Sequence, residues 1–278
     1  MPESHHQRRL PREFFSRPAT EVAPDLLGCV LWYDSPAGRV AVRLVEVEAY
    51  QGSSDPASHA FRGQTARNAV MFGPPGHVYV YFTYGMHFCA NLVCQPPGQA
   101  EAVLLRAGEV VAGDELAAER RLRENGRRPG NGRSLRAIDL ARGPARLCQA
   151  LGIDRGLDGA DVCDPGSALG IGPGQQPVAA APAAVATPES SAAAGPSRAG
   201  RPGAVQSGAV QSGAGPAASG QAVILTGPRV GVSQAADRPW RYWLAGDEHV
   251  SLYRPSKPRS SRQKPVTGRD AGDGTMLR

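Results

Sequence analysis

Two carboxylates alternate with apolar residues on one short stretch of the chain. In LVEVEAY, at residues 44–50, Glu46, Glu48 and Tyr50 point to one side of an extended strand. The rise of a strand places the two carboxylates roughly 6–7 Å apart. One of them can serve as a general base that activates a water molecule, and Arg106 is the candidate for a neighbouring positive charge. The alternative is an ordinary solvated strand face.

Arg106 and His59 are the next candidates for chemistry. Arg106 ends the apolar stretch AVLLR at 102–106, where we expect an arginine only if it faces a site. His59 lies in the polar loop at 53–69, and with Asp55 and Glu46 it suggests a metal site. No HxxxH, HxH or cysteine pair accompanies it, so we expect no metal there. The same conclusion holds for His87 and Cys89.

Tyrosines are concentrated in the stretch VYVYFTYGMHF at residues 78–88. Tyr79 and Tyr81 alternate with apolar residues as in a strand, whereas Tyr84 precedes a glycine and is expected at a hairpin tip. Aromatic faces stack on nucleobases, and arginines bind phosphates. An enzyme that acts on a base in a duplex extrudes it, and a ring at a hairpin tip can fill the vacated stack. The alternative is a tyrosine-rich strand that packs on its neighbours.

Other catalytic motifs find no support in the sequence. There is no GxSxG elbow, and no cysteine is matched to a histidine as a nucleophile would be. The GPPG stretch at 73–76 lacks the ending of a P-loop, and no GxGxxG follows a predicted strand. Nucleotide-driven chemistry is therefore not expected.

Charge and cysteine content indicate the class of protein. The formal net charge of +6 favours an anionic partner, and Lys257 and Lys264 are the only lysines. Five cysteines without a CxxC pair, and no apolar N-terminal segment, predict a reduced intracellular compartment. We therefore expect a cytoplasmic protein, at the nucleoid in a bacterium or in the nucleus of a eukaryote, that does not span a membrane.

The elements that must position these residues follow from hydrophobic periodicity. Strands are expected at Gly38–Tyr50 and Ala102–Ala107, and a hairpin at 77–95. A helix is expected at Asp114–Asn125 with Asp114 as its N-cap, and a second in GPARLCQALGI with Pro144 in its first turn. Two closing strands are expected within Pro228–Arg254.

These elements predict an α+β fold: a single domain with a curved, mostly antiparallel sheet, flanking helices and a protruding β-hairpin. The domain comprises residues 10–171 and 223–255. Residues 1–9 form a polar, disordered start, and 256–278 form a basic tail. Residues 172–222 are rich in Ala, Gly, Pro, Ser and Gln and repeat GAVQS, which predicts a disordered insertion.

A family resemblance is carried by several motifs together: VEVEAY, SHAFRGQTARNAVMF, GHVYVYFTYGMHFCANLV, AVLLRAGEV, GPARLCQALGI and RVGV. In this combination the chain resembles the alkyladenine (3-methyladenine, methylpurine) DNA glycosylases from about Leu10 to Arg254, apart from the insertion. The resemblance implies an enzyme of base excision repair. It would flip alkylated or deaminated purines out of duplex DNA and hydrolyse the N-glycosidic bond, leaving an abasic site.

The resemblance also implies roles for individual residues. Glu48 matches the general base, and Arg106 matches the arginine that helps to hold the attacking water. The pocket residues, the intercalating residue and the expected DNA contacts complete the site. Tyr50 would lie on one face of the flipped base and His59 and Tyr81 on the other, Asn91 would crowd the 2-amino group of guanine, Tyr84 would enter the minor groove, and Met86 and His87 would contact DNA.

The implied partner is double-stranded DNA with damaged purines, bound by a monomer without cofactor or metal. Strand cleavage by a β-lyase requires an amine for a Schiff base. Both lysines lie in the expected tail, so a monofunctional enzyme is expected. Two alternatives remain, a non-catalytic nucleic-acid-binding module on the same fold and a ribosome- or tRNA-binding protein.

Overall fold

One long strand joins the two halves of the sheet. β2 (Gly38–Gln51) pairs through its first half with β1 (Val30–Ser35) and through Glu46–Glu48 with β9 (Arg241–Leu244). β5 (Glu101–Ala112) runs along its other edge. The computed structural model describes residues 8–83, 85–124, 135–174, 184–185 and 222–255.

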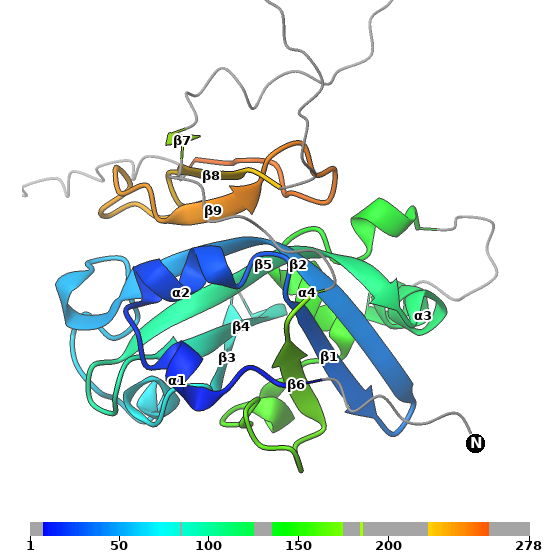
Figure 1. Cartoon of the computed structure of the whole chain (residues 1–278), viewed down its shortest axis with the longest axis horizontal. Helices are drawn as coiled ribbons and strands as arrows, with labels where there is room; N and C mark the ends of the chain where they lie inside the picture. The colour runs from blue at the N-terminus through cyan, green and yellow to red at the C-terminus, as the bar shows by residue number, and fades with distance from the viewer. Residues whose placement is uncertain (1–7, 84, 125–134, 175–183, 186–221, 256–278) are drawn as a thin grey trace, which may run out of the picture.

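Within these residues the strands form one nine-stranded sheet in the order β3-β4-β5-β2-β9-β8-β7, and β1 also pairs with β6. The other strands are β3 (Val78–Thr83), β4 (His87–Cys94), β6 (Leu169–Gly172), β7 (Ala184–Val185) and β8 (Ile224–Gly227). The named strand pairs are antiparallel except β7 with β8. In Figure 1 the sheet curls from β3 and β4 through β5 and β2 to β9 and β8. The predicted α+β domain with a curved sheet is thereby confirmed.

The pairing of β2 with β5 has three irregularities, one between Ala41 and Val42 and two near the carboxylates. Leu44 pairs with Gly108, Glu46 with Ala107 and Val47 with Leu105, so that Val45 and Arg106 are extra residues on opposite strands. Such bulges bend a strand and re-aim its side chains. Gly108 fits the close approach of the strands, because a Cβ there would lie 2.4 Å from the carbonyl oxygen of Arg43.

The helices pack into one hydrophobic core with the sheet. The core contains Val45, Val47 and Ala49 of β2, with residues of α2 and α4. The face that carries Glu46, Glu48 and Tyr50 is therefore the opposite one, as the alternation predicts. The helices are α1 (Arg12–Phe15), α2 (Ala19–Asp25), α3 (Asp114–Glu124) and α4 (Pro144–Leu151), and the short 3₁₀ turns are Gly52–Ser54, Ala69–Phe72, Ala137–Asp139 and Arg155–Leu157.

Several predicted boundaries move. α3 begins at Asp114, so this residue is the first of the helix rather than its N-cap, whereas Pro144 opens α4 as expected. β5 extends well beyond the predicted Ala102–Ala107 because its second half pairs with the first half of β2. The prediction of two closing strands within Pro228–Arg254 was wrong: β9 lies there, but its antiparallel partner β8 precedes Pro228, at the other end of a long connection.

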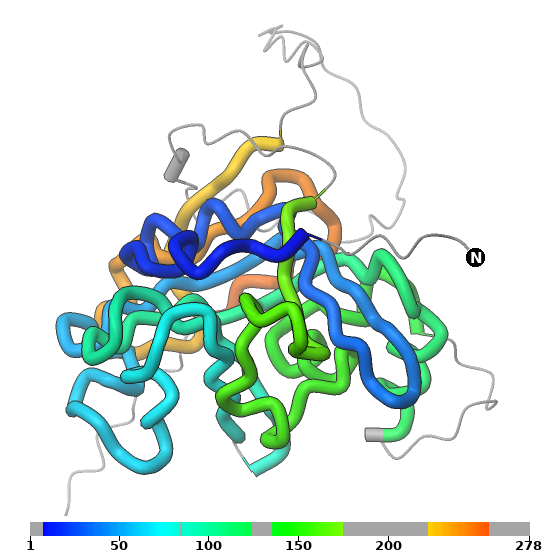
Figure 2. The backbone as a smooth tube through the Cα atoms, turned by 60° about the horizontal axis from the view of Figure 1, so that its bottom comes forward, coloured from blue at the N-terminus to red at the C-terminus, as the bar shows by residue number. Residues whose placement is uncertain are grey.

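The ends and the insertion are described only in part. Residues 1–7 and 256–278 lie outside the described residues, as does most of the predicted insertion at 172–222. The N-terminal segment passes beside β6 (Figure 2), where the Leu10 amide donates to the Ile171 carbonyl at 2.9 Å. Arg9 donates to the carbonyl oxygens of Val162, Ser167 and Leu169. No helix in the described ranges is long and apolar enough to cross a membrane.

Candidate active site

A cavity of about 800 Å³ opens on the face of the sheet that carries the carboxylates. Its walls come from β2 to β5, from the loop after β2, from the start of α4 and from the segment after β8. The lining includes Tyr50, Ser58, His59, Arg62, Met71, Tyr79, Tyr81, Thr83, His87, Cys89, Asn91, Leu104, Arg106, Pro144, Val230 and Gln234. The sheet thus gathers most of the predicted site residues around one space.

Strand register explains why these residues meet. Tyr79 pairs with Asn91, Asn91 with Leu104, and Leu104 with Glu48, which makes a row across four strands. Adjacent strands lie about 4.8 Å apart, and side chains two positions along a strand share its face. Tyr81, Cys89 and Arg106 therefore form the next row along the same face of the sheet.

Glu48 lies behind the cavity wall. Its side chain is 0% exposed, so the alternative of a solvated strand face was wrong. Oε2 accepts the Tyr50 hydroxyl at 2.8 Å, and Oε1 accepts the Val230 amide at 2.7 Å. The Arg106 Nη1 atom is 3.3 Å from Oε1. The three residues that contact Glu48 all line the cavity, so the carboxylate is one layer away from it.

Glu46 is the second buried carboxylate, and it accepts hydrogen bonds from two arginines. Its Oε1 accepts Nε of Arg106 and Nε of Arg241, each at 2.8 Å, and Ser251 donates its amide at 2.7 Å to Oε2. Burial alone would raise the pKa of Glu46, but the charges of Arg106 and Arg241 outweigh it and hold that pKa below its usual value. Burial opposes the charge on Arg106, yet Glu48 and Glu46 raise its pKa.

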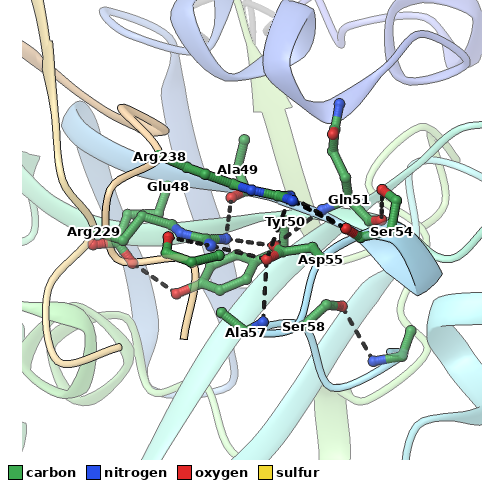
Figure 3. Close-up of polar contacts among 12 residues, drawn as sticks. Glu48, Ala49, Tyr50, Gln51, Ser54, Asp55, Ala57, Ser58, Arg229 and Arg238 are labelled. Atoms are coloured by element: carbon green, nitrogen blue, oxygen red, sulfur yellow. Dashed lines mark hydrogen bonds and ion pairs between the residues drawn. The ribbon is translucent and has the colours of Figure 1, made fainter. Parts of the chain in front are cut away.

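Tyr50 is held from behind by a buried ion pair (Figure 3). Arg229, 1% exposed, donates to both oxygens of Asp55, at 2.5 and 2.9 Å, and to the Ala49 carbonyl at 3.0 Å. Its guanidinium carbon lies 4.5 Å from the centre of the Tyr50 ring. Burial and the nearby Glu48 raise the pKa of Tyr50 well above its usual value, so its hydroxyl remains a donor.

Another part of the cavity lining is an aromatic cluster. His59 Nδ1 lies 3.1 Å from the Tyr79 hydroxyl, and the His59 ring meets the Tyr81 ring edge-on at 4.5 Å between centres. Burial, and then the charge of Arg67, lower the pKa of His59, which favours the neutral imidazole at pH 7. Asn68 holds the His59 loop by donating to the His59 carbonyl at 2.9 Å.

Comparison with known proteins now identifies the family. The sequence model of methylpurine-DNA glycosylase matches residues 13–188. The chain belongs to the methylpurine-DNA glycosylase family. Several relatives of this chain carry the name "Putative 3-methyladenine DNA glycosylase". One from Streptomyces avermitilis is 46% identical over 91% of this chain and 95% of its own length. Others come from Leifsonia xyli subsp. xyli, 44% identical over 87% and 92%, and Methanocella arvoryzae, 52% identical over 56% and 74%.

Membership of the methylpurine-DNA glycosylase family settles the class of activity. The protein is a DNA glycosylase, a hydrolase of N-glycosidic bonds whose substrate is DNA and whose process is DNA repair. The alternatives of a non-catalytic binding module and of a ribosome- or tRNA-binding protein are set aside by this family assignment. Among the described residues no group of three or more His, Cys, Asp and Glu side chains is placed to hold a metal ion.

The hairpin tip of this glycosylase is only partly described. Tyr84 lies outside the described residues. The Met86 amide donates to the Thr83 carbonyl at 3.1 Å and closes the turn, and Met86 itself is 65% exposed. His87 lines the cavity, and its buried Nδ1 has no hydrogen-bond partner among the described residues.

Sequence reasoning missed the polar residues that support the glycosylase site. Arg229 and Val230 belong to the RVGV motif, but nothing in that motif indicates a contact with Asp55 or Glu48. Arg241 and Ser251, the partners of Glu46, gave no signal beyond an arginine within an aromatic-rich segment. Asn91 lines the cavity and donates to the Tyr79 carbonyl at 3.2 Å.

Proposed function

We propose that this glycosylase flips alkylated or deaminated purines into the cavity and hydrolyses their N-glycosidic bond with a water molecule activated by Glu48. The lesions are 3-methyladenine, 7-methylguanine, hypoxanthine and ethenoadenine, and the product is an abasic site. One observation carries the proposal: Glu48 is a fully buried carboxylate whose contacting groups form the cavity wall.

The surroundings of Glu48 suit a general base. Two neutral donors, the Tyr50 hydroxyl and the Val230 amide, orient the carboxylate, and Arg106 extends from Glu48 to the cavity. In free enzymes catalytic hydrogen bonds often tighten only when the substrate binds. We expect the bound nucleotide to bring a water within hydrogen-bond distance of both Arg106 and Glu48. The carboxylate charge would also stabilise the positive charge that develops on the sugar as the base departs.

The walls of the cavity suit a flat, electron-poor base. Tyr50, His59 and Tyr81 line the cavity, and we propose that Tyr50 lies on one face of the flipped base and His59 and Tyr81 on the other. A purine alkylated at a ring nitrogen carries positive charge, which such faces attract. Asn91 is buried and lines the cavity, and we propose that it crowds the 2-amino group of normal guanine.

DNA engagement is assigned to the hairpin tip. We propose that Tyr84 enters the minor groove and fills the space of the flipped nucleotide, although it lies outside the described residues. Met86, exposed on the tip, and His87, at the cavity, would contact the duplex. Insertion of a side chain into the stack offsets part of the free energy of unstacking.

We further infer that the enzyme is monofunctional and acts as a monomer on damaged DNA in the cytoplasm. The only lysines, Lys257 and Lys264, lie outside the described residues. A Schiff base with the opened sugar requires such an amine. The abasic product is therefore expected to stay uncut until alkali is added.

The test uses two labelled duplexes, one with hypoxanthine and one with 7-methylguanine. Each is incubated with the wild type, with Glu48→Gln and with Glu115→Gln, a matched change at an exposed glutamate of α3. We expect cleavage, after hot alkali only, with the wild type and Glu115→Gln. Glu48→Gln should lower the excision rate at least about 100-fold while lesion binding persists.

Two outcomes contradict the proposal. Equal excision by Glu48→Gln would remove Glu48 from the role of base. Cleavage by the wild type before alkali would show a lyase and overturn the monofunctional assignment.

A further inference from the structure

The two buried carboxylates of β2 share one cation unequally. Arg106 donates Nε to Glu46 at 2.8 Å, whereas its Nη1 is 3.3 Å from Glu48. Glu46 also accepts Arg241 at 2.8 Å, while the two contacts shorter than 3 Å to Glu48 come from neutral groups. The shorter charged contacts therefore belong to Glu46, although Glu48 is equally buried.

This distribution matters for a base. An opposite charge within about 4–6 Å stabilises a carboxylate and can lower its affinity for a proton by about 10- to 1000-fold. A carboxylate in a close, bidentate pair with Arg106 would be a weak base, since efficiency in general base catalysis follows proton affinity. The bulge at Arg106 and the anchor at Glu46 hold this guanidinium in a different arrangement.

We propose that Glu46 is a positioning residue that draws the charge of Arg106 toward itself and so keeps Glu48 basic enough to accept a proton from water. The inference rests on the proposed role of Glu48. Arg241 completes the device, because it neutralises Glu46 from the side of β9 and limits how strongly Glu46 attracts Arg106.

The groups around Glu48 are few and come from each neighbouring element. They are Glu46 and Tyr50 on β2, Tyr81 on β3, Cys89 on β4, Arg106 on β5, Arg229 after β8 and Arg241 on β9. Burial raises the pKa of Tyr81 and of Cys89 above their usual values, so both stay neutral in acid. Changes at Glu46 and Arg241 are thus the direct way to alter the charge felt by Glu48.

The two changes have opposite expected effects. Glu46→Gln releases Arg106 toward Glu48. The acidic limb of the pH–rate profile of excision therefore moves to lower pH, and the plateau rate falls several-fold. Arg241→Gln leaves Glu46 more dependent on Arg106 and removes a cation near Glu48. The acidic limb therefore moves to higher pH, by about one unit. If Glu46 and Arg241 only supported the fold, both variants would have lower excision rates, but the acidic limbs of their pH–rate profiles would not move in opposite directions.

The experiment measures single-turnover excision of 7-methylguanine from about pH 4 to about pH 8, because this cationic base departs without protonation. Full-length wild type, Glu46→Gln, Glu46→Asp, Arg241→Gln and Arg241→Lys are compared, with Glu48→Gln as reference. Arg241→Lys keeps the charge and should keep the limb in place, and Glu46→Asp should restore part of the plateau rate. Thermal melting identifies variants that do not fold.

The inference is overturned if the acidic limbs of Glu46→Gln and Arg241→Gln stay in place or move in the same direction. If Glu46→Gln does not fold, the Arg241→Gln variant decides alone. A loss of stability in that variant would lower its excision rate but would not move the acidic limb of its pH–rate profile to higher pH. An active Glu48→Gln would instead refute the proposed base. An inactive Glu48→Gln with unmoved limbs refutes only the role of Glu46.

Discussion

Arg229 and Arg106 are buried arginines that contact carboxylates in different ways. Arg229 forms a closed, two-pronged pair with the single carboxylate of Asp55 and does not line the cavity. Arg106 lies between Glu46 and Glu48 and does line it. The closed pair ties residues 174 positions apart in the chain, so it holds structure. Arg106, the shared arginine, also lines the cavity, so its positive charge can act on a bound substrate.

The two arrangements also differ in what surrounds the cation. Arg229 stacks over the rings of Tyr50 and Trp240, at 4.5 and 5.1 Å, in an environment closed to solvent. Arg106 contacts two carboxylates on β2 and lines the cavity. A closed, two-pronged ion pair contributes rigidity, while one that is shared can respond to a substrate.

The largest effect on catalysis is expected at the shared arginine. Arg106→Gln removes the cation between two buried carboxylates and a donor to the proposed water. We expect the single-turnover excision rate to fall by about 100- to 1000-fold, as for the loss of one preorganised donor. The rate on a hypoxanthine duplex, measured at saturating enzyme, checks this. A rate within tenfold of the wild type would break the comparison.

The closed pair should affect stability more than rate. Arg229→Met leaves Asp55 buried without its partner, which is expected to lower the free energy of unfolding by about 3–5 kcal/mol. Urea denaturation measures this loss, and Asp55→Leu combined with Arg229→Met should recover much of it. At a temperature where the variant is folded, its excision rate should stay within about tenfold of the wild type. A larger loss of rate than for Arg106→Gln would reverse the comparison.

The smallest expected effect is at a neutral contact in the cavity, between His59 and the Tyr79 hydroxyl. Burial and the charge of Arg67 depress the pKa of His59 in the folded state, so the unfolded chain takes up this proton first. The contribution of His59 to stability is complete above about pH 6.5 and is lost as the pH falls through its lower folded pKa. Because the residue is exposed to solvent in the cavity, screening limits the loss to at most about 0.5 kcal/mol.

The measurement is urea denaturation at about pH 7.5 and about pH 5.5. The wild type should lose slightly more stability between these values than His59→Gln, which cannot titrate there. An equal or smaller loss in the wild type would contradict the assignment of a neutral, partly desolvated imidazole.

Local pattern was sufficient for much of the site. Alternation along 44–50 placed Glu48 and Tyr50 on one face, and the structure confirms that Val45, Val47 and Ala49 face the core. The predicted hairpin at 77–95 contains β3 and β4, and their register brings Tyr81 and Asn91 to the cavity. Period-two alternation and a turn are encoded by neighbours in the chain, which is why they can be read from the sequence.

Long-range partners could not be predicted in this way. Val230 and Ser251 bond to Glu48 and Glu46 across 182 and 205 residues, and no local pattern connects them. The bulges at Val45 and Arg106 arise only when two strands of unequal local length pair. Solvated and buried carboxylates also have the same alternation, so the exposure of Glu46 and Glu48 was undecided.

The sequence by itself determined the α+β class, the strand face that carries Glu46, Glu48 and Tyr50, and the hairpin of tyrosines, because these depend on the order of neighbouring residues. Only the tertiary structure decided that both carboxylates are buried and that Arg106 is shared between them. The reason is physical: the charge that a buried group feels depends on distance and on loss of water. Both are established only when distant segments of the chain pack together.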